Sequence, residues 1–84
     1  MVEEKVTLKN DEGLYARTAA KFLQNAVKFK SQITLTKDEK SYDGKSILSI
    51  LSMAGFKGDE IVISCEGNDE VDALDCLTTF INSI

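Results

Sequence analysis

The spacing of apolar side chains changes repeatedly along this chain of 84 residues, and these changes limit the folds that it can adopt. Alternation at every second residue, which is typical of half-buried strands, occurs at 2–8 and 32–36. The stretch 60–65 is the most strand-like of the chain, and a short strand is expected at 40–43, after a tight connection at 38–39. Spacings of three and four residues, which are typical of amphipathic helices, occur at 16–29, 47–54 and 71–81. So short a chain forms one domain, residues 1–84, in the order β-α-β-β-α-β-α. The pattern predicts an α+β fold in which an antiparallel sheet carries helices on one face.

The first and last helices are each expected to bury one apolar stripe. The stripe of the first helix consists of Ala16, Ala19, Ala20, Leu23 and Val27. Phe22 and Phe29 are expected at the margins of this stripe. The last helix follows a turn at 67–69, in which Asp69 is the expected N-cap. Its stripe consists of Val71, Leu74, Leu77 and Ile81.

The middle helix is short and begins after a serine. Ser46 precedes the apolar run ILSILSMA and is a suitable N-cap, because its hydroxyl can accept a hydrogen bond from a free N–H group of the first turn. Gly55 and Gly58 are expected to end this helix.

The composition excludes several kinds of function. Because the chain has no histidine, no imidazole can act as a general base, a metal ligand or a phosphoryl carrier. The net charge of −4 argues against binding to nucleic acid, which requires a basic face. No apolar run approaches the roughly 20 residues that span a membrane, and no signal peptide is visible, so a cytoplasmic protein is expected.

No cofactor, metal or catalytic role is expected from the remaining residues. Cys65 and Cys76 cannot complete a tetrahedral zinc site without histidine, and we interpret them as reduced side chains of the core. The chain has no paired carboxylates in a defined motif and no phosphate-binding glycine loop, so it is not expected to be an enzyme.

Two segments carry a resemblance to a known family. The first, GLYARTAA at 13–20, resembles the Gly-Leu/Ile-His-Ala-Arg-Pro-Ala motif of HPr, the phosphocarrier of the bacterial sugar phosphotransferase system. The second, KSIL at 45–48 with LS at 51–52 and KGDEI at 57–61, resembles the regulatory-serine region of HPr from low-GC Gram-positive bacteria. The similarity runs over essentially the whole chain. It implies an open-faced sandwich with three helices on one face of an antiparallel sheet of strand order 1-4-2-3.

The departures from the family pattern concern the first motif. Tyr15 stands where HPr has the histidine that carries the phosphoryl group, and Thr18 replaces the family's proline. A phenol is a poor nucleophile at neutral pH, so the resemblance implies that carrier function is lost. In this respect the chain is similar to the Crh group of HPr paralogues, in which glutamine replaces the histidine. We interpret Tyr15 as a surface aromatic or a partner contact. Ala16 and Arg17 are expected to retain an anion site at the start of the helix.

The second motif is intact at its serine. Ser46 matches the residue that HPr kinase/phosphorylase modifies in the family, and a phosphate there would meet the positive end of a helix. The same serine can also be a plain N-cap, and the two roles are compatible. Asp43 and Gly44 differ from the residues that usually precede this serine in the family. Ser49 and Ser52 are expected to be ordinary solvent-facing residues.

An exposed apolar surface is expected beside Ser46. Ile47 and Ile50 supply the core face of the short helix, so Leu48 and Leu51 are expected to point outward. The alternative is that these leucines widen the core face. In the family this surface binds enzyme I, the kinase and the regulator CcpA. The predicted partner-binding residues are Tyr15, Arg17, Ile47, Leu48, Leu51 and Phe56.

The residues and the resemblance bear differently on three classes of function: a regulatory binding protein, a phosphocarrier and an enzyme. The resemblance favours a regulatory binding protein in carbon catabolite control, which is phosphorylated on Ser46 and acts with a CcpA-type regulator. The second class is a phosphocarrier of the sugar phosphotransferase system, which would need a nucleophile that this chain lacks. The third class, an enzyme, has no supporting motif. The sequence also leaves open a homodimer formed by exchange of the first strand.

Overall fold

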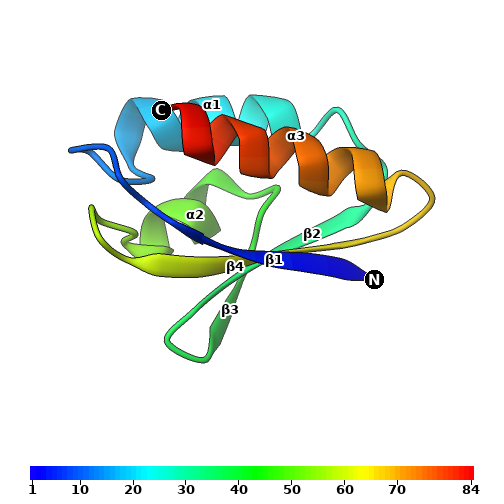
Figure 1. Ribbon diagram of the computed structural model, residues 1–84, viewed down its shortest axis with the longest axis horizontal. Helices are drawn as coiled ribbons and strands as arrows, with labels where there is room; N and C mark the ends of the chain where they lie inside the picture. Colours follow the sequence, from blue (N-terminus) through cyan, green and yellow to red (C-terminus); the bar gives the residue numbers. More distant parts are fainter.

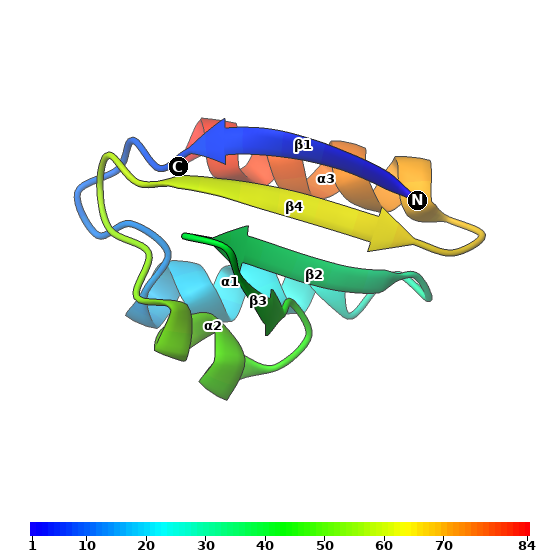
Figure 2. The same cartoon turned by 90° about the horizontal axis from the view of Figure 1, so that it is seen from below.

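Three helices lie on one face of a four-stranded sheet in the computed structural model, which describes all 84 residues (Figures 1 and 2). The predicted order of elements is confirmed. The elements are β1 (Val2–Thr7), α1 (Ala16–Ala26), β2 (Gln32–Lys37), β3 (Lys40–Asp43), α2 (Ile47–Met53), β4 (Glu60–Glu66) and α3 (Glu70–Ser83). No helix is both long enough and apolar enough to cross a membrane.

The sheet has the strand order β1-β4-β2-β3, and every neighbouring pair is antiparallel. The order implied by the resemblance is therefore confirmed. Alternate residues of the three longer strands point toward the helices and are buried, because one face of the sheet is covered and the other is open. These inward side chains are Val6, Ile33, Leu35, Ile61, Ile63 and Cys65.

The buried face of α1 differs from the predicted stripe. Phe22, expected at the margin, is fully buried, and its ring meets that of Phe80 edge to face with centroids 6.3 Å apart. Ala16 and Ala20 are exposed, and α1 ends at Ala26, so Val27 lies beyond it and is exposed. The buried residues of the helix are Ala19, Phe22 and Ala26. Alanines occur on several sides of α1, and this small side chain does not distinguish one face from another.

The end of α2 also differs from the prediction. Ala54, not a glycine, follows the helix in the left-handed backbone conformation, with φ of +53°. Gly55 is needed for packing, because a Cβ there would lie 2.9 Å from the side chain of Leu8. Gly58, with φ of +93°, belongs to the turn that leads into β4. At the other end, Ser46 is the N-cap as predicted, since its Oγ accepts a hydrogen bond from the Ser49 N–H at 3.3 Å.

The two cysteines have different surroundings. Cys65 on β4 is buried beneath the helices, and this burial raises the pKa of its thiol. Cys76 on α3 is half-buried, and its sulfur lies 3.9 Å from Oδ1 of Asn25. The prediction of a core side chain is confirmed for Cys65, whereas Cys76 lies at the edge of the core.

Asp69 joins two distant segments instead of capping its own helix. It precedes α3, as predicted, but its carboxylate makes no capping hydrogen bond. It accepts hydrogen bonds from the N–H of Lys30, and from both the N–H and the hydroxyl of buried Ser31. These bonds, the Ser31 hydroxyl first, lower the pKa of the Asp69 carboxyl. In α3 itself Leu77 and Ile81 are buried as expected, whereas Val71 is exposed.

We expect Asp69→Asn to reduce stability at neutral pH more than at acidic pH. A lowered pKa in the folded state stabilises the protein above the pKa of the unfolded chain, about 4, and this stabilisation disappears as the pH falls through the folded value. Urea midpoints of the wild type and the variant should therefore differ at pH 7 and converge below about pH 4. Asp75→Asn, at an exposed position beyond the first turn of α3, is the control. A difference that stays constant from pH 7 to pH 3 would contradict this account.

Candidate functional site

Two loops meet at one end of the sheet and carry the aromatic residues singled out by the sequence. The Leu14 N–H donates a hydrogen bond to the Gly55 carbonyl at 3.0 Å. Gly13 has a left-handed backbone, with φ of +63°, and a Cβ there would lie 2.3 Å from the same carbonyl oxygen. Only glycine fits such an approach. Tyr15 directly follows Leu14, and Phe56 directly follows Gly55, so the two loops bring these aromatic residues to the same end of the molecule.

Tyr15 stands directly before α1 on a strained segment of backbone. Its own backbone is extended, its side chain is 46% exposed, and the next residue, Ala16, has a left-handed φ of +50°. Non-glycine residues rarely adopt this conformation, so the surrounding structure must hold it. Thr18 does so, because its Oγ1 accepts from the Tyr15 N–H at 3.0 Å and donates to the Gly13 carbonyl at 2.7 Å.

Sequence reasoning missed this role of Thr18. In the sequence Thr18 is noticeable only as the replacement for the family's proline. A threonine three residues after an N-cap is a recognised position for a side chain that bonds back to the cap, and this spacing was the available signal.

The predicted anion site consists of two neighbouring residues at the start of α1. Arg17 is exposed and takes part in no ion pair. The Thr18 N–H already donates to the Tyr15 carbonyl at 3.2 Å. The Thr18 N–H is therefore not free for an anion beside Ala16, whereas the Arg17 guanidinium is, and anion binding here stays a prediction.

Ser46 lies in a tightly bonded connection between β3 and α2. Its N–H donates to the Asp43 carbonyl at 3.2 Å, and the Lys45 N–H donates to the Asp43 carboxylate at 2.9 Å. Gly44, noted as unusual before this serine, is needed for packing, since a Cβ there would lie 2.5 Å from Cγ2 of Ile33. The unusual residues before Ser46 thus have a structural explanation.

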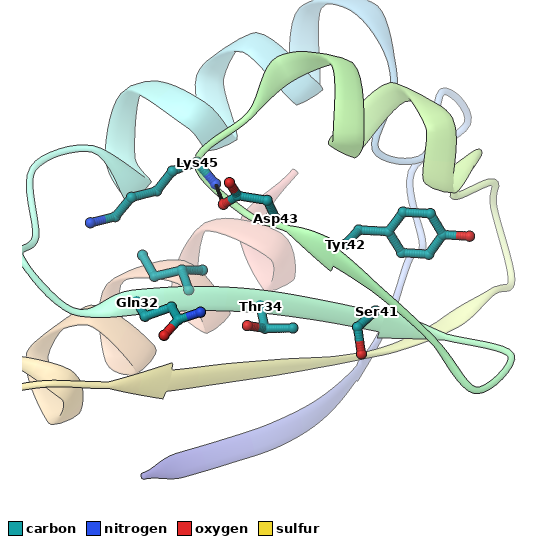
Figure 3. A pocket seen from close by; sticks show the side chains of 7 residues that line it. Gln32, Thr34, Ser41, Tyr42, Asp43 and Lys45 are labelled. Atoms are coloured by element: carbon teal, nitrogen blue, oxygen red, sulfur yellow. Dashed lines mark hydrogen bonds between the residues drawn. The ribbon is translucent and has the colours of Figure 1, made fainter.

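A shallow groove of about 450 Å³ lies next to this connection, between β2 and β3 (Figure 3). Figure 3 shows its mainly polar lining, in which Lys45 and Asp43 lie on one side and Gln32 and Thr34 of β2 lie on the other. The Lys45 ammonium donates to the Phe29 carbonyl, so it is already engaged. The lining residues are Gln32, Ile33, Thr34, Ser41, Tyr42, Asp43 and Lys45. No group of His, Cys, Asp or Glu residues is arranged to hold a metal ion.

The exposed apolar surface is smaller than predicted. Leu48 on α2 is 74% exposed and Phe56 is 56% exposed, as expected. Leu51 was expected to point outward, but it is half-buried against the core, as is Ile47. Leu51 therefore contributes partly to the core face of α2, as in the alternative prediction, whereas Leu48 does not. We use "the apolar surface" below for Tyr15, Leu48, Leu51 and Phe56.

Charge is unevenly distributed around the apolar surface. Residues 13–37 and 44–58, which include α1 and α2, contain no Asp or Glu, so all 14 acidic residues lie elsewhere. The exposed cations of α1 and the turn after it include Arg17, Lys21 and Lys28. The net charge alone does not indicate this separation, whereas the positions of the acidic residues along the sequence do.

Comparisons with known proteins agree with this architecture. A family model described as "PTS HPr component phosphorylation site" matches residues 2–83. HPr-like protein Crh of Halalkalibacterium halodurans is 44% identical over 81 residues, which cover 96% of each chain. The crystal structure of HPr-C-His from Thermoanaerobacter tengcongensis has a TM-score of 0.97 and 43% identity, covering 99% of this chain and 93% of that one. Crh of Bacillus subtilis, described as a dimer with a swapping domain, has a TM-score of 0.79 and 38% identity, covering 99% and 95%.

Proposed function

Because this chain belongs to the HPr family, we propose that it is a regulatory protein that acts by binding other proteins and does not carry phosphate on histidine. The observation that carries the proposal is the residue before α1. Tyr15 stands there with its backbone held by Thr18, and the chain contains no histidine that could replace it.

Loss of the carrier reaction follows from the chemistry of the side chain. A neutral imidazole is a nucleophile at pH 7 and forms a labile bond to phosphorus, whereas a phenol is almost entirely protonated there. The phosphate ester of a phenol is also too stable to be passed on. The second candidate, a phosphocarrier, rests on the description of the family model and requires that Tyr15 accept a phosphoryl group.

Ser46 is the proposed regulatory site. Its Oγ lies at the N-terminal end of α2, and the bond that it accepts from the Ser49 N–H is long, at 3.3 Å. A phosphate on Ser46 would offer more and stronger acceptors to the same N–H. Its negative charge would also be stabilised by the positive end of the helix dipole. We propose HPr kinase/phosphorylase as the modifying enzyme and a CcpA-type transcription regulator as the partner in carbon catabolite control. The need for ATP places this regulation in the cytoplasm.

The apolar surface and the charges beside it define the chemistry of the partner. Leu48 and Phe56 are exposed, and the neighbouring helix α1 carries Arg17 and Lys21 without any acidic residue. A partner with an apolar centre and an acidic rim would complement both features, and the charges would accelerate its approach. A surface of enzyme I could be recognised in the same way.

We expect phosphorylation of Ser46 to be selective. Purified HPr kinase/phosphorylase with ATP should add one phosphate to the wild type and none to Ser46→Ala, as measured by intact mass. Ser52→Ala is the matched control, because Ser52 is an exposed serine on the same helix. Loss of the N-cap should also lower the free energy of unfolding of Ser46→Ala by about 1 kcal/mol. Equal phosphorylation of wild type and Ser46→Ala would mean that another residue is the phosphorylation site. An unmodified wild type would mean that Ser46 serves only as the N-cap of α2.

A homodimer is a further proposal, which the position of β1 supports. This strand lies at the edge of the sheet and pairs only with β4, and residues 8–15 connect it to α1. If that connection opened, β1 of one copy could form the same pairing with β4 of another. Sedimentation equilibrium over a range of concentrations would distinguish a monomer from such a dimer.

A further inference from the structure

Lys37, the last residue of β2, contacts residues 53–59, a stretch that is distant from it in the sequence. Its ammonium donates hydrogen bonds to the carbonyls of Ala54 at 2.8 Å and Met53 at 3.4 Å, at the C-terminal end of α2. It forms an ion pair with Asp59 at 3.0 Å. It also lies 5.8 Å from the ring centroid of Phe56. The Lys37 side chain is only 16% exposed, so water provides few alternative partners.

Asp59 extends this link to the backbone of Phe56. One oxygen of its carboxylate accepts both the Phe56 N–H, at 2.8 Å, and the Lys37 ammonium. The Phe56 N–H bond, followed by the bond to Lys37, lowers the pKa of the Asp59 carboxyl. An ionised Asp59 therefore holds both partners at neutral pH.

Helix α2 depends on contacts at its ends. It has only seven residues, and so short a helix does not form without tertiary support. Its last carbonyls carry a partial negative charge, which the Lys37 ammonium complements. The next residue, Ala54, is held in the left-handed conformation, with φ of +53°. Without Lys37, the Ala54 and Met53 carbonyls would lose this donor.

We propose that Lys37 is a positioning residue for the apolar surface, because it fixes the C-terminal end of α2 and the backbone of Phe56 relative to the sheet. This proposal rests on the proposed function only in taking that surface as the partner-binding site. Residues fixed before binding lose less conformational entropy when a partner docks. Lys37 would therefore affect affinity without touching the partner.

The experiment compares Lys37→Met with Lys40→Met. Methionine keeps the aliphatic length of lysine and removes the ammonium. Lys40 faces Lys37 in the β2–β3 pairing and is exposed, so it is a matched control. Amide hydrogen exchange is measured by NMR at Phe56, in α2, and in the β1–β4 pairing as an internal reference.

We expect exchange at Phe56 and in the last turn of α2 to be roughly tenfold faster in Lys37→Met, the change expected when hydrogen bonds to a charged donor are lost. Exchange in the β1–β4 pairing should change less, and Lys40→Met should resemble the wild type. Unchanged exchange at Phe56, or equal acceleration in every element, would overturn the proposal. If Lys37→Met does not fold, Asp59→Asn replaces it, because it removes the ion pair and keeps an acceptor for the Phe56 N–H. Faster exchange is then expected at Phe56 only, since Lys37 still donates to the Ala54 carbonyl, and unchanged exchange at Phe56 would overturn the proposal.

A binding measurement separates this proposal from the proposed function. The dissociation constant for HPr kinase/phosphorylase should be roughly tenfold higher for Lys37→Met than for Lys40→Met. The effects of Lys37→Met and Phe56→Ala should not add, because both act through the same side chain. Equal affinities of the two lysine variants would overturn the positioning role. A wild type that does not bind the kinase would contradict the proposed function instead, and the exchange data would still decide the role of Lys37.

Discussion

Phe22→Ala is expected to lower the free energy of unfolding by about 3–5 kcal/mol, as large-to-small substitutions of buried phenylalanines do. The Phe22 side chain is fully buried and packs edge to face on Phe80, so truncation removes both apolar burial and an aromatic contact. A domain of this size is stable by only about 4–13 kcal/mol, so this loss is a large fraction of the total. Urea denaturation followed by circular dichroism measures the change.

Val27→Ala is the control for this prediction. Val27 belongs to the stripe that the sequence pattern predicted to be buried, yet the structure places it beyond α1 and exposed. Its truncation should change the free energy of unfolding by less than about 0.5 kcal/mol. A larger loss for Val27→Ala than for Phe22→Ala would mean that α1 presents the predicted face, and that the orientation described above is wrong.

Tyr15→His is expected to convert a chain that accepts no phosphate from enzyme I into one that does. The Thr18 hydroxyl bonds to the backbone N–H of residue 15, and this bond does not depend on the side chain there. Ala16 and Arg17 are present, and Leu48 and Phe56 of the apolar surface are exposed, so the new imidazole would stand in an otherwise retained site. With phosphoenolpyruvate and enzyme I, Tyr15→His should acquire acid-labile phosphate, whereas the wild type should remain unlabelled.

Two further variants sharpen this test. Tyr42→His introduces the same imidazole on β3, away from α1, and should remain unlabelled. Tyr15→His combined with Thr18→Pro restores the proline of the family motif and removes the Thr18 hydroxyl, so it shows whether that hydroxyl is needed. If both Tyr15 variants fold and neither is labelled at high enzyme I concentration, the apolar surface no longer fits enzyme I. Labelling of the wild type on Tyr15 would support the phosphocarrier alternative.

The strands could be predicted from the sequence because their apolar residues differ strongly from their neighbours. In β2, for example, Ile33 and Leu35 alternate with Gln32, Thr34 and Thr36, and only one face can be buried. In α1 the alanines allow more than one apolar stripe to be drawn. Only the packed structure shows that the large ring of Phe22 faces the core.

The polar contacts were harder to predict because they join residues that are distant in the sequence. Asp69 was expected to cap α3, which is a local role, but its partners are Lys30 and Ser31 on another loop. Lys37 likewise had no local signal for its contact with the end of α2. By contrast, the Ser46 cap involves a residue only three positions away, and the sequence was sufficient to predict it.

The bridge between Leu14 and Gly55 allows the surface to evolve independently of the fold. It joins the two loops through a main-chain N–H and a main-chain carbonyl, and neither atom belongs to the side chain of Tyr15 or Phe56. A substitution at Tyr15 or Phe56 therefore leaves this connection in place. In a lineage of such proteins, one mutation can remove or restore a nucleophile, or change the preferred partner, while the scaffold that presents it stays the same.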